Sequence, residues 1–316
     1  MNPSSLRILI TGATGCAGTH LSALALARGA QVYGVAHAGA FVPGVIGQIG
    51  DLTQRAVIDQ ILADTQPDWI FHLAAIFPGA AGDISPERMI QVNVTGTFNV
   101  LDAVRQLRPE ARVLVISSSA VYGQPAQTDQ PITETAVLQP HSLYGTTKVA
   151  QEMLAIQFFV ENELHTIRAR TFNQTGPREP ANLVCATLAR QIARIEQGLQ
   201  EPILRAVTLV PRRDFTDVRD VVAGYWAALE FGEPGQAYNI CSERSESIRR
   251  IADILLASSV RRDIQIVETN PTPSARAVLN QIGDAARLRV RSGWHPRIPI
   301  ETSLRDLLDE WRARGD

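Results

Sequence analysis

The chain carries TGATGCAG at positions 11–18, directly after the apolar run LRILI at positions 6–10. Its glycines have the spacing G-x-x-G-x-x-G, and an amphipathic segment of helical period follows them. Gly12 can make a sharp turn, Gly15 lets a pyrophosphate approach the backbone, and Gly18 permits close packing of a helix on a strand. The start of a helix also offers unpaired N–H groups to an anion. Because the motif lies between a strand and a helix, it predicts a dinucleotide-binding turn rather than a merely tight turn.

Outward from this turn, short runs rich in Val and Ile alternate with longer segments of helical period. This alternation is typical of successive βαβ units and predicts the α/β class, with a Rossmann-type doubly wound parallel sheet. The expected strands are 6–10, 31–36, 69–73, 113–117 and 165–170, and the expected helices include 17–28, 54–65 and 86–106.

The pattern changes after residue 173, where the loop TGPREP at 175–180 leads into shorter elements rich in arginine and proline. We therefore predict that residues 1–172 form the dinucleotide-binding domain, which also carries the catalytic residues. Residues 173–316 are expected to form mainly a smaller, interleaved α/β part that binds the substrate, with some segments returning to the first domain.

Composition narrows the class of protein. The formal net charge of −2 over 316 residues gives no field suited to nucleic acid or an anionic membrane, so we expect neither partner. Cys16, Cys185 and Cys241 are scattered and form no C-x-x-C pair, which favours a reducing compartment. No signal peptide or long apolar run is found, so we expect a cytoplasmic protein. The six histidines lack metal-ligand spacing, and no metal site is expected.

A second motif, YGTTK at 144–148, places the phenol of Tyr144 and the ammonium of Lys148 on one face of a helix. A nearby cation favours phenolate, which makes the tyrosine a usable acid or base near neutral pH. Upstream, SSSAVYG at 117–123 follows an expected strand, so that a hydroxyl, that of Ser118, points into the crevice where such sheets bind ligands.

Together with LAA at 73–75 and NVTGT at 93–97, these motifs resemble the extended short-chain dehydrogenase/reductase family over nearly the whole chain. The resemblance implies that Ser118 polarises the substrate oxygen and that Tyr144 exchanges its proton. It also implies that Lys148 tunes Tyr144 while binding the nicotinamide ribose. The chemistry agrees, because hydride transfer to a carbonyl needs a proton donor near the developing alkoxide.

The expected second strand ends in VAH at 35–37, without the acidic residue that usually holds the adenosine ribose of NAD. Its absence removes a repulsion against a 2′-phosphate, and His37 can lie near that group, so NADP(H) is favoured, with NAD(H) as the alternative. Asp51 is placed to hold the adenine edge or to cap the next helix, and both roles can coexist. The predicted cofactor-binding residues are Gly12, Thr14, Gly15, Cys16, Ala17, Gly18, His37, Asp51, Leu52, Leu73, Ala74, Ala75, Asn93, Tyr144 and Lys148.

The residues before VYG at 121–123 bear on the reaction. Sugar nucleotide 4,6-dehydratases of the family carry Thr-Asp-Glu there, and their two carboxyls serve water elimination. This chain has Ser118-Ser119-Ala120 instead. Reduction, oxidation or epimerisation is therefore favoured over dehydration.

Three later motifs, FNQTGP at 172–177, RDFTDVRD at 213–220 and GWHP at 293–296, resemble the GDP-mannose branch, and within it the GDP-4-keto-6-deoxy-D-mannose reductases. The resemblance implies reduction of a 4-keto sugar nucleotide, most directly to GDP-D-rhamnose. Val207-Thr208 replaces a Gly-Asn pair in the nucleotide-binding loop of that branch, which leaves the identity of the nucleotide base open. The predicted substrate-binding residues are Ser119, Asn173, Arg178, Leu183, Arg213, Arg219 and Arg276.

Alternatives stay open. Arg213, Asp217 and Arg219 can instead form a charge network at a helix start. The protein can be another sugar nucleotide 4-epimerase or 4,6-dehydratase, or a non-catalytic dinucleotide sensor, although it has kept Tyr144 and Lys148.

The segment 149–160 is apolar around more than one helical face, which calls for a partner helix. The family commonly pairs this helix and the one near 92–106 across a two-fold axis. We therefore expect a homodimer through the helices near 92–106 and 145–160.

Overall fold

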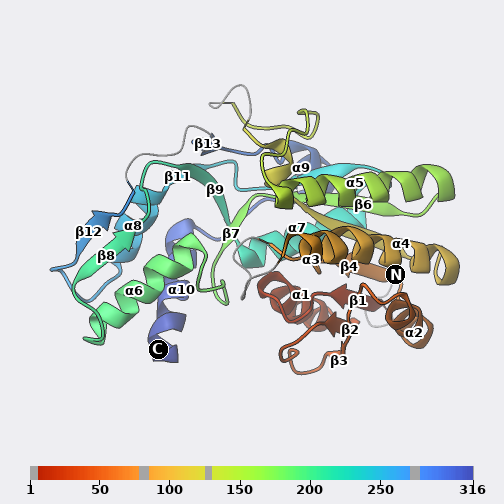
Figure 1. Ribbon diagram of the computed structural model, residues 1–316, viewed down its shortest axis with the longest axis horizontal. Coiled ribbons are helices and arrows are strands. Elements are labelled where there is room, and N and C mark those ends of the chain that lie inside the picture. Colours follow the sequence, from red (N-terminus) through yellow and green to blue (C-terminus); the bar gives the residue numbers. More distant parts are fainter. Residues whose placement is uncertain (1–5, 78–84, 125–129, 271–277, 316) are drawn as a thin grey trace.

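The computed structural model describes residues 6–77, 85–124, 130–270 and 278–315. Two parts lie side by side in Figure 1: a large sheet with its helices, and a smaller α/β part on the left. The large sheet has an apolar core on each face, and the smaller part has a core of its own between helices α6 (Val184–Glu196), α8 (Ile248–Ala257) and α10 (Ile300–Arg314).

The large sheet is parallel throughout and has the strand order β10-β6-β5-β4-β1-β2-β3. Its strands are β1 (Arg7–Thr11), β2 (Gln31–Ala36), β3 (Ile46–Ile49), β4 (Trp69–His72), β5 (Arg112–Ser118), β6 (Thr166–Thr171) and β10 (Ala237–Ile240). The central strands are buried on both faces, which explains their continuous runs of Val, Ile and Leu. The predicted doubly wound parallel sheet is confirmed, and the ends of the five strands predicted with bounds differ by at most one residue.

Helices cover both faces of this sheet. Helix α1 (Cys16–Ala27) packs with α7 (Val218–Phe231) and α9 (Ala286–Ser292) on one face. On the other face lie α2 (Arg55–Thr65), α4 (Gly96–Leu107) and α5 (Leu143–Asn162). Helix α5 crosses next to strands β5 and β6, which places the tyrosine and lysine of the second motif at the carboxyl end of the sheet.

The segment predicted as one helix over 86–106 is divided. Helix α3 (Pro86–Ile90) passes through a π-helical turn, η2 (Gln91–Thr95), into α4. The π turn contains Asn93, whose side chain is buried and bonded to the backbone of Ile76. π turns inside helices occur frequently at functional sites, and this one lies beside the expected cofactor cleft.

The smaller part contains two further sheets. Strands β7 (Asn173–Thr175), β9 (Arg212–Asp217), β11 (Ser245–Ser247) and β13 (Asn280–Gln281) form one, and β8 (Ile203–Ala206) pairs with β12 (Gln265–Glu268) in the other. Between β9 and β11 the chain returns to the large sheet through α7 and β10. The two parts are therefore interleaved along the sequence.

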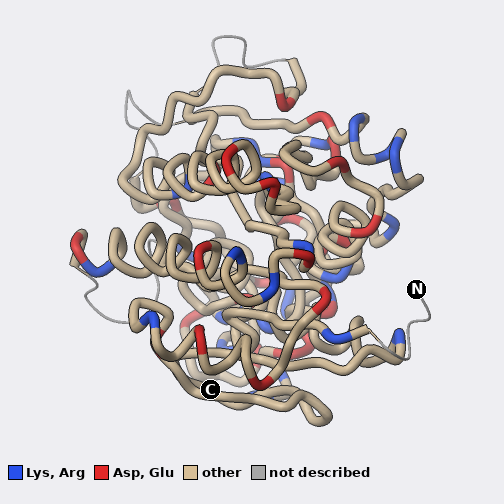
Figure 2. Tube along the Cα trace, turned by 90° about the vertical axis from the view of Figure 1, so that its right-hand side faces the viewer, with Lys and Arg blue, Asp and Glu red and all other residues tan. Residues whose placement is uncertain are grey.

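Charged residues of both signs are interspersed over the visible trace in Figure 2. Many arginines pair with a carboxylate, as Arg312 does with Glu196 and Arg168 with Glu152. None of the helices in the described ranges is long and apolar enough to cross a membrane.

Candidate active site

The glycine turn joins β1 to α1. The Gly12 N–H donates to the Val35 oxygen at 2.8 Å, and a Cβ added at Gly18 would lie 2.2 Å from the Gly12 oxygen, so no larger residue fits there. Helix α1 begins at Cys16, and Gly15 before it offers no side-chain cap. The first N–H groups of α1 thus have no capping side chain, which suits a dinucleotide pyrophosphate.

The other predicted cofactor residues lie around this turn at the carboxyl ends of β2 and β4. Thr14 donates its hydroxyl to the Ala38 oxygen at 2.7 Å, and His37 is exposed directly after β2. Leu73, Ala74 and Ala75 follow β4 and are half-buried, and Leu52 is buried. The order of these residues along the sheet edge suits an extended dinucleotide.

Asp51 is already engaged by its neighbours. It accepts bonds from the Thr53 N–H and hydroxyl at 2.9 and 2.8 Å, and it pairs with Arg88 at 2.8 Å. Burial acts against the charge, but these bonds from Arg88 and Thr53 lower the pKa of Asp51 to about 2. Its carboxylate therefore organises the turn before α2, whose N-cap position is Gln54.

The catalytic residues predicted from the sequence meet between β5 and α5. Burial raises the pKa of Tyr144 to about 12, and a hydrogen bond with the Ser118 side chain opposes this. The expected lowering of the Tyr144 pKa towards neutral by Lys148 is therefore not found, and the phenol is protonated near neutral pH. The Lys148 ammonium lies 5.7 Å from the centre of the Tyr144 ring and donates to the Ile116 oxygen at 2.8 Å. A serine hydroxyl, a phenol and an amine thus converge at one point of the sheet edge.

Lys148 is almost completely buried. Burial lowers its pKa to about 7, and the carboxylate of Glu152, one helical turn further along α5, acts in the opposite direction. A lysine with a pKa in this range can be charged or neutral under ordinary conditions, which suits a group that assists proton transfer.

A buried polar chain beneath the cofactor cleft was not predicted from the sequence. His72 bonds to the hydroxyls of Thr11 and Thr97, each at 2.8 Å, and Gln151 donates to Thr97 at 2.6 Å. Burial lowers the pKa of His72 to about 3, so this imidazole is neutral. The chain fixes β1, β4, α4 and α5 relative to one another, and its residues are far apart in sequence.

Asn93 and Thr147 form a second link that sequence reasoning found only in part. The Asn93 amide donates to the Thr147 hydroxyl at 3.0 Å and to the Ile76 oxygen at 2.9 Å. Asn93 had been predicted at the cofactor, whereas Thr147 had not, although it stands inside the YGTTK motif. Together they attach the segment after β4 to the catalytic helix.

The predicted substrate residues come mainly from the smaller part. Asn173 starts β7, and Leu183 precedes α6. Arg178 is exposed and has a positive φ of 68°. Ser119 is buried, and its hydroxyl donates to the Gln281 side chain at 3.0 Å. Arg276 lies outside the described residues.

Arg213 and Arg219 differ. No carboxylate among the described residues pairs with Arg213, and burial lowers the pKa of its guanidinium. Arg219 instead forms ion pairs of 2.7 Å with both Asp217 and Asp306. The charge-network alternative therefore describes Arg219, while Arg213 donates through Nη1 to the Arg212 backbone oxygen at 2.8 Å and pairs with no carboxylate of the described residues.

A family model described as GDP-mannose 4,6 dehydratase matches residues 9–307. The chain belongs to this family. GDP-6-deoxy-D-mannose reductase of Pseudomonas aeruginosa is 36% identical over 312 residues and covers 98% of both chains. A solved structure of RMD from Pseudomonas aeruginosa in complex with NADPH has a TM-score of 0.85 at 33% identity and covers 98% of this chain and 99% of that one. A GDP-mannose 4,6-dehydratase of Vibrio cholerae is 24% identical and covers 96% of this chain and 93% of the relative.

Membership of the GDP-mannose 4,6-dehydratase family confirms the predicted family and its nucleotide-sugar branch. The relatives that match over nearly the whole chain are named as reductases and dehydratases, and the Pseudomonas aeruginosa neighbour was solved with NADPH. The individual site residues stay predictions, supported by the geometry described above.

Proposed function

We propose that the protein reduces the 4-keto group of GDP-4-keto-6-deoxy-D-mannose to give GDP-D-rhamnose, with NADPH favoured and NADH as an alternative donor. The observation that carries this proposal is the turn after β5. It presents Ser118, Ser119 and Ala120, so it offers a hydroxyl at the reacting oxygen and no carboxyl for water elimination. The similarity to the reductase of Pseudomonas aeruginosa supports the same reaction.

When bound at the glycine turn, the nicotinamide cofactor would supply the hydride for the 4-keto carbon. Ser118 and Tyr144 donate hydrogen bonds to the carbonyl oxygen, and Tyr144 transfers its proton to that oxygen as the C–O bond becomes an alcohol. Lys148 stabilises the phenolate left behind, because its ammonium lies against the Tyr144 ring. Tyr144 is reprotonated from solvent to close the cycle.

The cofactor fits the residues of the glycine turn. The α1 N-terminus without a side-chain cap would hold the pyrophosphate, and the segment Leu73–Ala75 would line the nicotinamide half. Exposed His37 would lie beside the 2′-phosphate of NADP(H), and no acidic residue stands directly after β2 to repel it.

The sugar nucleotide would lie between the two parts. We assign Arg213 to its diphosphate, because a planar guanidinium without a carboxylate partner matches paired phosphate oxygens. Asn173, Arg178 and Leu183 belong to the segment that crosses from the large sheet to the smaller part, and the predicted boundary at 172/173 falls at its start. Arg276 and Ser119 remain assigned to the substrate as well.

The proposed homodimer would bury apolar side chains of α4 and α5. Phe98 on α4 is 44% exposed, and Met153 and Val160 on α5 are 45% and 68% exposed. These two helices are neighbours, so the exposed side chains fit a two-fold four-helix contact. The cytoplasmic location expected from the cysteines stays a prediction.

The test is to incubate purified protein with GDP-4-keto-6-deoxy-D-mannose and NADPH or NADH while following nicotinamide absorbance, with Tyr144→Phe alongside. We expect oxidation of the cofactor by the wild type and a near loss in the variant. If both cofactors stay reduced while GDP-mannose or a UDP-sugar is converted without net cofactor change, the reductase proposal fails and an epimerase or dehydratase replaces it. Nicotinamide binding without turnover of any sugar would indicate a sensor.

A further inference from the structure

We propose that Glu152 is a positioning residue for the reduction: its buried carboxylate fixes the catalytic helix α5 against strand β5 and supplies the negative charge that Lys148 faces. This inference rests on the proposed roles of Ser118, Tyr144 and Lys148. It concerns a residue that the sequence motifs did not single out.

The register between α5 and β5 is set by two adjacent contacts. Residues 144, 148 and 152 follow one another at single helical turns and share one face of α5. Lys148 donates to the Ile116 oxygen at 2.8 Å, and the next residue of β5, Ser117, donates its hydroxyl to Glu152 at 2.6 Å. Both contacts fall directly before Ser118, so they set how the Tyr144 phenol meets the Ser118 hydroxyl.

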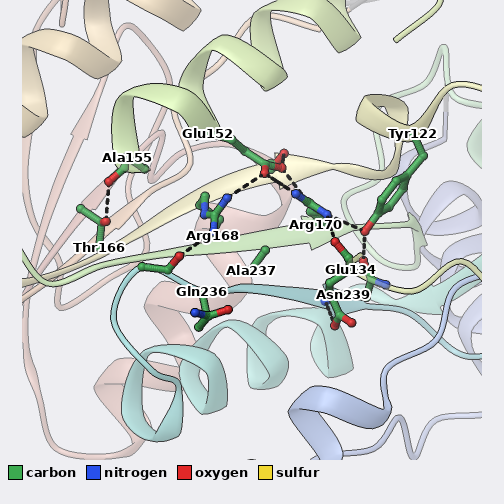
Figure 3. Close-up of polar contacts among 12 residues, drawn as sticks. Tyr122, Glu134, Glu152, Ala155, Thr166, Arg168, Arg170, Gln236, Ala237 and Asn239 are labelled. Atoms are coloured by element: carbon green, nitrogen blue, oxygen red, sulfur yellow. Dashed lines mark hydrogen bonds and ion pairs between the residues drawn. The ribbon is translucent and has the colours of Figure 1, made fainter. Parts of the chain in front are cut away.

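Two arginine side chains pair with the single carboxylate of Glu152. Figure 3 shows its carboxylate above β6 between two guanidinium groups. Arg170 binds it in a fork through Nε and Nη2, at 2.9 and 2.7 Å, and Arg168 approaches to 3.4 Å. All three side chains are buried. One carboxylate thus separates two arginine cations from the ammonium of Lys148.

The network also continues away from the catalytic helix. Arg170 donates to the Tyr122 hydroxyl at 3.0 Å and to the backbone carbonyl oxygen of Glu134 at 2.9 Å. The Tyr122 hydroxyl in turn donates to the Asn239 side chain at 2.7 Å (Figure 3). The turn after β5, strand β6 and strand β10 are therefore held by the same set of bonds. Glu152 connects this set of bonds to helix α5.

Glu152 also acts on the protonation of Lys148. Lys148 lies against the Tyr144 ring and interacts with the Glu152 carboxylate on its own helix and with neutral His72 on β4. The two arginines of β6 pair with Glu152 itself. Of these groups, the Glu152 carboxylate raises the pKa of Lys148 against burial. With an amide in its place the arginines would face Lys148 without compensation, and its ammonium would lose its proton at lower pH. Reductase activity needs that ammonium, so the alkaline decline of activity would then begin at a lower pH.

The experiment compares Glu152→Gln with Glu196→Gln. Glu196 is a matched control, because it accepts a fork from Arg312 at 2.7 and 2.8 Å and a serine hydroxyl, Ser259, at 2.7 Å, but lies in the smaller part. The measurements are kcat and kcat/KM for the keto sugar with NADPH from pH 5 to 9, NADPH affinity by fluorescence over the same range, and melting temperature.

We expect Glu152→Gln to lower kcat about tenfold or more at pH 8 and to move the alkaline decline of activity and of NADPH affinity down by about one pH unit. Glu196→Gln should keep both profiles. Ser117→Ala, which removes the register contact without changing charge, should lower kcat at every pH with no displacement of the decline.

If Glu152→Gln keeps the wild-type pH profiles of activity and NADPH affinity and lowers only the melting temperature, Glu152 has a purely structural role and the proposal is wrong. Should Glu152→Gln not fold, Glu152→Asp keeps the charge and withdraws it from Ser117: a lowered kcat on an unmoved profile supports the proposal, and wild-type kcat overturns it. NADPH affinity needs no sugar. If the wild type is silent with the keto sugar while Glu152→Gln displaces the NADPH-affinity profile, the proposed function fails and this inference stands.

Discussion

The polar groups on the two sides of the proposed active site are paired in different ways. On the catalytic side, Lys148 bonds to Ile116, and Glu152 is saturated by Ser117 and two arginines. On the substrate side, Arg213 has no carboxylate partner in the described ranges, and Arg178 is exposed. The chemistry is therefore held in place before any ligand binds, whereas recognition depends on groups that still have donors to offer.

The comparison teaches that charge alone does not identify a ligand residue. Arg213 and Arg219 stand six residues apart in one motif, yet Arg219 is consumed by Asp217 and Asp306. What distinguishes them is whether the fold has already supplied a carboxylate. Variants on both sides of the site should therefore respond differently in kinetics and in stability.

Replacing Lys148 with Met should lower kcat by about 10²- to 10⁴-fold, because the phenolate of Tyr144 loses its cation. The melting temperature should stay the same or rise, since burial already disfavours the charged amine. Nicotinamide absorbance and thermal unfolding measure the two effects. A sharp fall in melting temperature would mean that the lysine braces the fold rather than serving the chemistry.

Arg213→Ala and Arg219→Ala should separate binding from stability. The first should raise KM for the sugar nucleotide by about 10- to 100-fold with little change in melting temperature, because it removes charge-assisted bonds to the diphosphate. The second should leave KM within about twofold and lower the melting temperature, because buried Asp217 loses its partner. Steady-state kinetics and thermal unfolding decide, and equal KM effects would remove the distinction between the two arginines.

His37→Asp should reverse the cofactor preference. A carboxylate directly after β2 would repel the 2′-phosphate and accept bonds from the ribose of NAD, so the ratio of kcat/KM for NADPH to that for NADH should fall about tenfold or more. His295→Asp, an exposed change in the C-terminal part, is the control. An unchanged ratio would show that His37 does not lie near the adenosine ribose.

The smallest effect concerns the segment between the two parts. Glu179 is buried and accepts the Thr175 hydroxyl at 2.6 Å, and burial raises its pKa from 4.5 to about 7. The folded state therefore holds this proton more tightly than the unfolded state, so its stabilising contribution is complete below pH 4.5 and is lost as the pH rises towards 7. Glu179→Gln should flatten this part of the melting temperature against pH, by roughly a few degrees. An unaltered curve in the variant would assign the dependence to other groups.

Local patterns were enough to predict much of the large sheet and the meeting of Ser118, Tyr144 and Lys148 at its edge. Strand β2 has the predicted bounds, and Tyr144, Lys148 and Ser118 meet as the spacing implied. These features depend on neighbours in sequence or on the shared edge of parallel strands.

Features that depend on distant partners were not predicted. The π turn contains Asn93, whose side chain bonds to Ile76. The sequence offered the pairing of Arg219 with Asp217 as an alternative, but not its second partner, Asp306 on α10. Glu152 could not be recognised either, because its arginines stand on a strand that the sequence marks only by its apolar residues. Arginines inside a buried strand indicate that a carboxylate must lie nearby, but the sequence does not show which carboxylate pairs with them.

The return of the chain to the large sheet limits how this enzyme can be divided. Helix α7 and strand β10 follow β9 in sequence but complete the core of the large sheet: β10 pairs with β6, Tyr225 bonds to Thr171 on β6, and Trp226 packs on Trp69 and Phe71 of β4. A fragment that ends at residue 172 would leave β6 as an open edge beside uncovered apolar surface. An exchange of C-terminal halves would therefore also replace α7 and β10, which pack on the large sheet. Exchanging only pieces such as β7 to β9 or the residues after β10 leaves that packing unchanged.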